Sequence, residues 1–210
     1  KSEGYMKNIL KVASMALVLS LTLFGITNKA SAAKLTLYCS VEIDVCEMLE
    51  QAYEKETGTK VAMTRASSGE TFAKIKAEAS NPKGDVWFGG TGDPHLTAAQ
   101  ENLTEKYKSV HFNDLLPAAQ NQAKNADFKS VGIYVGALGF GYNKDLLAKK
   151  GLPAPKSWMD LTKPIYKGEI QVANPNSSGT AYTTLATILQ IFGEDKGWDY
   201  MKKLHANINT

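Results

Sequence analysis

The stretch that decides the fold is Lys60-Val-Ala-Met-Thr-Arg-Ala-Ser-Ser-Gly-Glu-Thr-Phe-Ala-Lys-Ile75. Residues 60–65 are typical of a β-strand, and the serines and glycine after them indicate a tight turn. Residues 71–79 then have helical spacing, with Phe72 and Ile75 on the inward face. Strand, turn and helix in this order form the repeating unit of a parallel sheet covered by helices.

Similar units lie on both sides of this stretch. Residues 35–39 predict a strand, and residues 42–57 predict a helix that Gly58 ends. Residues 85–88 predict a third strand, followed by a glycine turn and a helix capped by Asp93. Alternating strands and helices predict an α/β fold with a binding crevice at the carboxyl ends of its strands.

A second serine-glycine turn, Asn176-Ser-Ser-Gly-Thr180, lies between an expected strand over residues 169–173 and an apolar helix over 180–192. Another helix is expected over 194–206. Free N–H groups, a helix dipole and hydroxyl donors converge at such a turn, which suits an anion. One turn of this kind can be an ordinary helix cap. Two of them predict a single ligand held from two sides.

The predicted ligand-binding residues follow from these turns and from the ends of the strands. Each supplies a backbone N–H group, a hydroxyl or a place in the turn, and helix caps without a ligand remain the alternative for the serine-glycine turns. Trp87 is expected in the core, Tyr134 as a packing residue and His95 as an incidental surface residue. The predicted set is Ser40, Ser67, Ser68, Gly69, Glu70, Gly89, Gly90, Thr91, Ser177, Ser178, Gly179 and Thr180.

Residues 131–142, Val-Gly-Ile-Tyr-Val-Gly-Ala-Leu-Gly-Phe-Gly-Tyr, differ from the rest of the chain because they combine four glycines with β-forming side chains. We expect an extended strand that passes between two bodies of the protein. The Gly139-x-Gly141 pair is a poor dinucleotide motif, because Lys144 stands where a third glycine belongs.

The amino-terminal residues predict export. Residues 6–32 have a basic start, an apolar run over 12–26 and a small-residue Ala-Ser-Ala site, which is typical of a cleaved signal peptide. Residues 1–5 would then lie upstream of the fold, and the mature protein would begin at Ala33 in the periplasm. There Cys39 and Cys46 could form a disulfide or remain two buried thiols.

Composition and motifs argue against several other functions. The net charge of +3 comes without a basic stripe, which does not favour nucleic acid. The three histidines are scattered, so we expect neither a metal site nor a cofactor. The serine-glycine turns lack the G-x-S-x-G form of a hydrolase, and a P-loop sequence is missing. We therefore expect a binding protein and no enzyme.

Several segments together resemble the extracytoplasmic solute-binding proteins of ABC importers, in the ferric-iron or phosphosugar-type subgroup. These segments are Thr36-Leu-Tyr-Cys-Ser40, Asp85-Val-Trp-Phe-Gly-Gly90, Gly136-Ala-Leu-Gly-Phe-Gly-Tyr-Asn143 and Asn174-Pro-Asn-Ser-Ser-Gly-Thr-Ala181. The resemblance implies a type II periplasmic-binding-protein-like fold, in which two lobes with central mixed sheets close over a ligand. Residues 33–135 would form the first lobe, and 136–210 an incomplete second lobe of a chain truncated at its carboxyl end.

The resemblance also implies the partners. The protein would be a monomer that captures a small anionic solute and delivers it to a membrane permease and its ATPase. A phosphorylated organic anion is favoured, because the visible donors suit phosphate. Ferric iron held with a co-bound anion, and a thiamine- or polyamine-type ligand, remain alternatives. Ferric binders use a first-lobe histidine, and the stretch Cys39-Ser-Val-Glu42 has none.

Overall fold

A computed structural model of the chain describes residues 34–209. The predicted upstream residues 1–5 and signal peptide 6–32 therefore lie outside the described residues. Within residues 34–209, no helix is both long and apolar enough to cross a bilayer. The contacts of the residues from Leu35 onward group them into one unit, and the expected lobe boundary at residues 135 and 136 stays a prediction.

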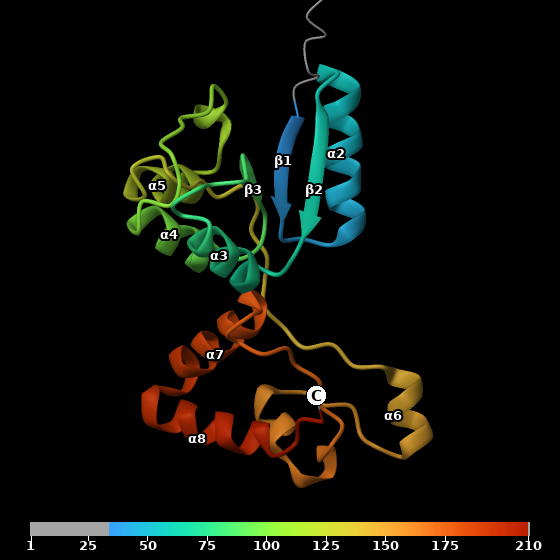
Figure 1. Ribbon diagram of the computed structural model, residues 1–210. Helices are drawn as coiled ribbons and strands as arrows, with labels where there is room; N and C mark the ends of the chain where they lie inside the picture. The colour runs from blue at the N-terminus through green and yellow to red at the C-terminus, as the bar shows by residue number, and fades with distance from the viewer. Residues whose placement is uncertain (1–33, 210) are drawn as a thin grey trace, which may run out of the picture. The chain divides into compact units, whose positions relative to one another are not determined.

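A three-stranded sheet organises the first part of the chain (Figure 1). Its strands are β1 (Lys34–Cys39), β2 (Lys60–Arg65) and β3 (Val86–Phe88), in the order β2-β1-β3. Strand β3 runs parallel to β1, with Leu37 opposite Val86 and Cys39 opposite Phe88. The predicted parallel pairing is confirmed for these two strands. The carboxyl ends of β1 and β3 consequently meet at one edge of the sheet.

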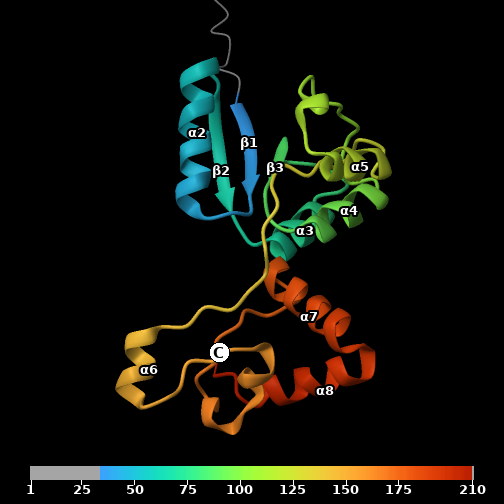
Figure 2. The same ribbon diagram turned by 180° about the vertical axis from the view of Figure 1, so that it is seen from behind.

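The helices follow the strands as expected. Helix α2 (Ile43–Thr57) packs along β2 and ends at Gly58, whose φ of 70° is left-handed and favours glycine (Figure 2). Helices α3 (Ser68–Ala77) and α4 (Gly92–Gln100) come directly after the turns that follow β2 and β3. The expected cap at Asp93 is wrong by two residues, because Thr91 is the extended residue before α4 and Asp93 lies in its first turn.

A small core fixes the end of β1. Leu37, Cys39 and Cys46 are buried together, and Val61 and Phe88 pack against them. Cys39 and Cys46 form a disulfide, with their Cα atoms 6.1 Å apart. The two alternatives left open for these cysteines are thereby resolved. The disulfide joins the end of β1 to the first turn of α2, directly beside Ser40.

The segment after the sheet is less regular than expected. A 3-10 turn (Phe112–Asp114) and helix α5 (Pro117–Asn125) follow α4. Residues 131–143 carry no regular secondary structure, so the predicted strand over 131–142 is wrong in the described structure. Strands require a hydrogen-bonded partner, and no described segment pairs with this one.

The last part of the described chain is mainly helical. It contains α6 (Lys144–Lys150), two 3-10 turns (Trp158–Thr162 and Pro164–Tyr166), α7 (Gly179–Phe192) and α8 (Glu194–His205). Helices α7 and α8 pack on each other around Ile188, Tyr200 and Leu204. The strand expected over 169–173 is reduced to a single parallel bridge between Ile170 and Ile208. Residues 144–209 therefore contain this single bridge in place of the expected central sheet.

Candidate functional site

Three helices begin at the predicted serine and glycine turns. Ser67 precedes α3, Thr91 precedes α4 and Ser178 precedes α7, each in extended conformation. Short hydroxyl side chains favour this position because they can satisfy the free N–H groups of a first turn. The Ser178 hydroxyl does so, accepting the Ala181 N–H at 3.3 Å. The predicted turns are therefore confirmed as helix starts.

The first serine-glycine turn contacts the second directly. The Gly69 N–H donates to the Ser177 carbonyl oxygen at 3.0 Å, and the Ser67 hydroxyl lies 2.6 Å from the same oxygen. A Cβ atom on residue 69 would lie 2.6 Å from that oxygen, which is too close for any side chain. Gly69 is thus required by a close approach of two backbones.

The Ser177 carbonyl is held in place by its own turn. Both Ser177 and Ser178 donate their N–H groups to the Asn174 carbonyl, at 3.1 and 2.9 Å. The Asn176 N–H donates to the Asn174 side chain at 2.9 Å. Four consecutive peptide units are therefore fixed relative to one another, and the oxygen that meets the first turn is a rigid acceptor.

Ser68 lies where the three turns meet. Its side chain is buried, and its hydroxyl oxygen accepts the Thr91 N–H at 3.2 Å. A Cβ atom on Gly90 would lie 2.2 Å from this oxygen, and one on Gly179 would lie 2.9 Å from it. The starts of α3, α4 and α7 consequently converge around one hydroxyl. The positive ends of three helix dipoles point to the same region.

Thr91 has an unusual hydroxyl group. Its Oγ1 atom is buried, and within residues 34–209 it has no hydrogen-bond partner. It faces Gly179, where a Cβ atom would lie only 2.1 Å away. An unpaired buried hydroxyl costs free energy, so this atom is a donor without an acceptor in the described structure.

The glycine turn after β3 is held by side chains from two other segments. Gly89 and Gly90 have φ values of 79° and 90°, which glycine adopts without strain. His95 Nε2 lies 2.8 Å from the Gly89 carbonyl oxygen. The Tyr134 hydroxyl accepts the Gly90 N–H at 2.7 Å and donates to the Gly90 carbonyl at 2.9 Å. The Gly90 N–H, which was expected to face an anion, is thus already bonded.

Two of the sequence-based expectations are corrected here. His95 is not incidental, because its ring is partly buried and bonds to the turn. Tyr134 is not a packing residue, since it is 57% exposed and its hydroxyl bonds to the backbone of Gly90. For His95 the available signal was its place in the first turn of a helix that follows a glycine turn. For Tyr134 the sequence carried no signal, because its partner is 44 residues away.

Ser40 is bonded through its hydroxyl rather than free at the edge of the sheet. It is buried, receives the Trp87 indole N–H at 3.0 Å and lies 3.1 Å from the Thr71 hydroxyl. The Trp87 ring in turn stacks on His95 with ring centroids 3.6 Å apart. The expectation of Trp87 in the core is wrong, because it is half-buried and links Ser40 to the residue that holds Gly89.

Charge at the site is set by burial and by hydrogen bonds. Burial lowers the pKa of His95 below its usual 6.5, although the hydrogen bond to Gly89 acts in the opposite direction. A neutral ring must carry its proton on Nε2, because the Gly89 carbonyl can only accept. The pKa of Glu70 is lowered because its carboxylate accepts the hydroxyl and N–H of Ser67.

The remaining predicted residues lie at the margin of the cluster. Glu70 is exposed and completes the cap of α3 through Ser67. Thr180 is exposed on α7, and its carbonyl accepts the Thr184 hydroxyl at 2.9 Å. The structure therefore brings together Ser40, Ser67, Ser68, Gly69, Gly90, Thr91, Ser177 and Gly179, with Gly89 and Ser178 adjoining them in the chain. That these residues bind a ligand stays a prediction.

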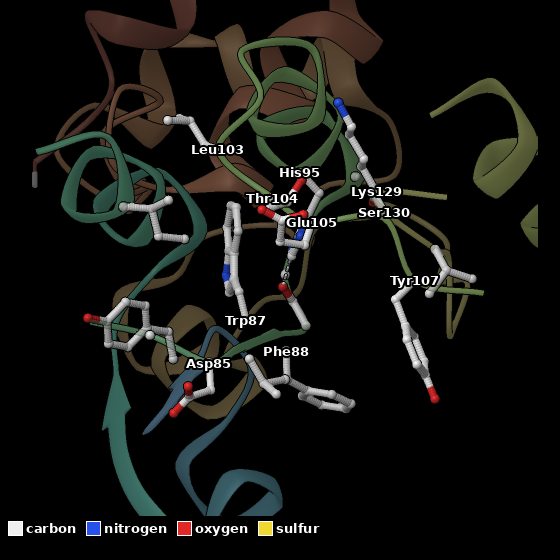
Figure 3. A pocket seen from close by; sticks show the side chains of 18 of the residues that line it. Asp85, Trp87, Phe88, His95, Leu103, Thr104, Glu105, Tyr107, Lys129 and Ser130 are labelled. Atoms are coloured by element: carbon white, nitrogen blue, oxygen red, sulfur yellow. Dashed lines mark hydrogen bonds between the residues drawn. The ribbon is translucent and has the colours of Figure 1, made fainter. Parts of the chain in front are cut away.

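A cavity of about 920 Å³ lies beside β3, as Figure 3 shows. Trp87 and His95 line it side by side, with Phe88 and Tyr107 also on its wall. Of the predicted site residues, Gly89 and Gly90 belong to this lining. The convergence of helix starts and the cavity are consequently different features that share the glycine turn. Among residues 34–209, no group of three or more His, Cys, Asp or Glu could hold a metal ion.

The chain is similar to known binding proteins. Residues 85–210, more than half of the chain, match the family described as bacterial extracellular solute-binding protein. A Haemophilus influenzae protein is 43% identical over 201 residues, which are 95% of this chain and 58% of that protein. A putative 2-aminoethylphosphonate-binding periplasmic protein of Salmonella typhimurium is 30% identical, over 74% of this chain and 43% of its own length.

Solved structures agree with this similarity. The periplasmic binding protein AfuA of Actinobacillus pleuropneumoniae, with exogenous fructose 6-phosphate bound, superposes with a TM-score of 0.81 at 45% identity. The match covers 86% of this chain and 57% of AfuA. Iron-bound HitA of Pseudomonas aeruginosa has a TM-score of 0.60 at 21% identity and covers 83% of this chain and 54% of HitA, which indicates a shared fold alone.

The chain spans little more than half the length of the first relatives that it matches. Fold, glycine and serine turns, and sequence identity point in the same direction. The chain belongs to the family of bacterial extracellular solute-binding proteins.

Proposed function

We propose that the protein containing this chain is the substrate-binding component of an ABC importer, and that it captures a small phosphorylated organic anion. The observation that carries the proposal is the convergence of three helix starts around the Ser68 hydroxyl. Backbone dipoles and hydroxyl donors aimed at one region favour a phosphate group. The protein would bind the anion without converting it and deliver it to a membrane permease and its ATPase.

The proposal divides the predicted residues by function. Ser68, Thr91 and Ser178 would donate their hydroxyl protons to the anion. In the described structure the Ser68 and Ser178 hydroxyl oxygens accept an N–H, and the Thr91 hydroxyl has no partner. Ser67, Gly69 and Ser177 would join the two turns, since their polar groups bond to one another. Periplasmic location and a monomeric state belong to the same proposal.

Two findings support a phosphorylated ligand over the alternatives. AfuA, at 45% identity, holds fructose 6-phosphate, and the Salmonella relative is described as a putative 2-aminoethylphosphonate binder. Iron binding is represented by HitA at 21% identity, a similarity of fold only. A phosphorylated sugar or a small organophosphorus anion is therefore the favoured solute class.

Calorimetry tests the proposal on the protein expressed from the complete reading frame that contains this chain. Fructose 6-phosphate should bind, whereas fructose should not. The double substitution Ser68→Ala with Ser178→Ala should weaken binding by more than about tenfold, because charge-assisted hydrogen bonds to phosphate are lost. Ser80→Ala, at an exposed serine outside the site, is the matched control. Unchanged affinity in the double variant would rule the proposal out.

A further inference from the structure

Both backbone groups of Gly90 are occupied by one side chain. The Tyr134 hydroxyl oxygen accepts the Gly90 N–H at 2.7 Å, and its proton goes to the Gly90 carbonyl oxygen at 2.9 Å. Gly90 lies against Ser68, where the three helix starts converge. The Tyr134 hydroxyl oxygen therefore accepts a hydrogen bond from the Gly90 N–H, which adjoins the proposed anion site.

This contact differs from the one between the two serine-glycine turns. The Ser177 carbonyl belongs to a backbone that three hydrogen bonds to Asn174 hold in place. Tyr134 is 57% exposed and belongs to residues 131–143, which have no regular secondary structure. A side chain with this exposure can leave its partner by a rotamer change, whereas a fixed carbonyl cannot. The Tyr134 contact is the exchangeable one.

A phosphate oxygen and a phenol oxygen compete for the same donor on unequal terms. Hydrogen bonds from an N–H to an ionised acceptor are shorter and roughly twice as strong as those to a neutral one. The Gly90 N–H belongs to the same planar peptide unit as the Gly89 carbonyl, which is bonded to His95. The direction of this N–H is therefore also fixed by His95. An anion near Ser68 would thus replace the phenol at a donor that is already aimed.

We propose that the Tyr134 hydroxyl is a displaceable occupant of the anion site: it accepts the Gly90 N–H in the absence of ligand and gives way to a ligand oxygen. The inference rests on the proposed function and adds a consequence to it. Ligand binding releases the Tyr134 side chain, and with it the segment 131–143 that joins the sheet region to the helical region.

The test uses the protein from the complete reading frame, with fructose 6-phosphate as the probe, and compares Tyr134→Phe with Tyr142→Phe. Tyr142 is an exposed tyrosine of the same segment and serves as the matched control. Removing the competing hydroxyl should tighten binding by about two- to tenfold, the range for one ordinary hydrogen bond. A residue that only supported the structure would weaken binding when removed.

Hydrogen exchange measured by mass spectrometry gives a second readout. In the wild type, fructose 6-phosphate should speed exchange across residues 131–138, because Tyr134 is released. In Tyr134→Phe, exchange there should already be fast and should not respond to the ligand. Affinity that is equal or weaker in Tyr134→Phe, or slower exchange in the wild type on binding, overturns the inference.

The two proposals fail in different ways. A wild-type protein that binds neither fructose 6-phosphate nor inorganic phosphate refutes the proposed function and the inference with it. A wild-type protein that binds, combined with an unchanged affinity in Tyr134→Phe, refutes the inference alone.

Discussion

The two serine-glycine turns have nearly the same sequence but opposite roles in the hydrogen bonds between them, because one donates and the other accepts. The turn Ser67-Ser68-Gly69 donates the Gly69 N–H to the second turn, and the Ser67 hydroxyl oxygen lies 2.6 Å from the same acceptor. The turn Ser177-Ser178-Gly179 accepts through the Ser177 carbonyl. The difference arises from Asn174, which accepts the N–H groups of the second turn. The Ser177 carbonyl is then directed at the first turn. Two similar motifs therefore form one joint with distinct halves.

The surroundings of the two turns differ as well. The first lies beside the sheet, close to Ser40 and the disulfide between Cys39 and Cys46. The second turn precedes α7, which packs against α8. This turn is held by hydrogen bonds to Asn174 and has no covalent link beside it among the described residues. A covalent link on one side and weak contacts on the other imply that the two halves of the joint respond differently to substitution.

The largest expected effect on stability comes from the disulfide. For a sequence separation of 7, loop-closure entropy gives a stabilisation of about 2 to 3 kcal/mol. Reduction should lower the urea midpoint of unfolding, and the variant Cys39→Ser with Cys46→Ser should no longer respond to reductant. A urea midpoint that does not change on reduction would show that the disulfide does not stabilise the fold.

The next effect concerns the joint itself. Gly69→Ala places a Cβ atom 2.6 Å from a fixed backbone oxygen, and overpacking of this kind costs about 1 to 3 kcal/mol. Fructose 6-phosphate affinity should fall with it, because the two turns are forced apart. Gly136→Ala is the control, since a Cβ atom there meets no heavy atom within 4 Å. Equal stability of both variants would argue against a close joint.

A smaller effect separates the two serines that precede α3 and α7. Ser178→Ala removes an N-cap hydrogen bond and should cost about 1 kcal/mol. Ser178→Asn should recover most of this, because asparagine caps equally well. Ser67→Ala should cost more than Ser178→Ala, as it also removes a contact to the second turn. Chemical denaturation of the three variants checks the order, and the reverse order contradicts the joint.

The smallest effect is in the pH dependence of two capping carboxylates. The pKa of Glu70 is lowered from 4.5 by Ser67, and that of Asp160 is lowered from 3.8 to about 2, first by Lys163 and then by the backbone N–H of Lys156. A lowered pKa in the folded state stabilises the protein above the unfolded value, and this contribution is lost as the pH falls.

The two carboxylates should therefore lose their effect in different pH ranges. The stability difference between wild type and Glu70→Gln should be constant above about pH 5 and close as the pH falls below 4.5. For Asp160→Asn it should close only between 3.8 and about 2. Urea midpoints measured from pH 6 to pH 2 test both, and a gap that widens on acidification would contradict the assignment.

Local signals predicted the elements that build the site. Serine, threonine and glycine at helix starts act within three or four residues, so the starts of α3 and α7 could be read directly. The expected strand over 131–142 was wrong because its valines and tyrosines fit a sheet only where a partner strand is available. Propensity describes such a segment, and pairing decides its conformation.

The sequence by itself determined that the chain is α/β, that it carries two donor-rich turns and that they belong to one binding protein. Only the tertiary structure decided which donors remain available. Ser177 meets Ser67 across 110 residues, and Tyr134 meets Gly90 across 44. Contacts at such separations depend on the packing of whole elements, and no local pattern of residues encodes them.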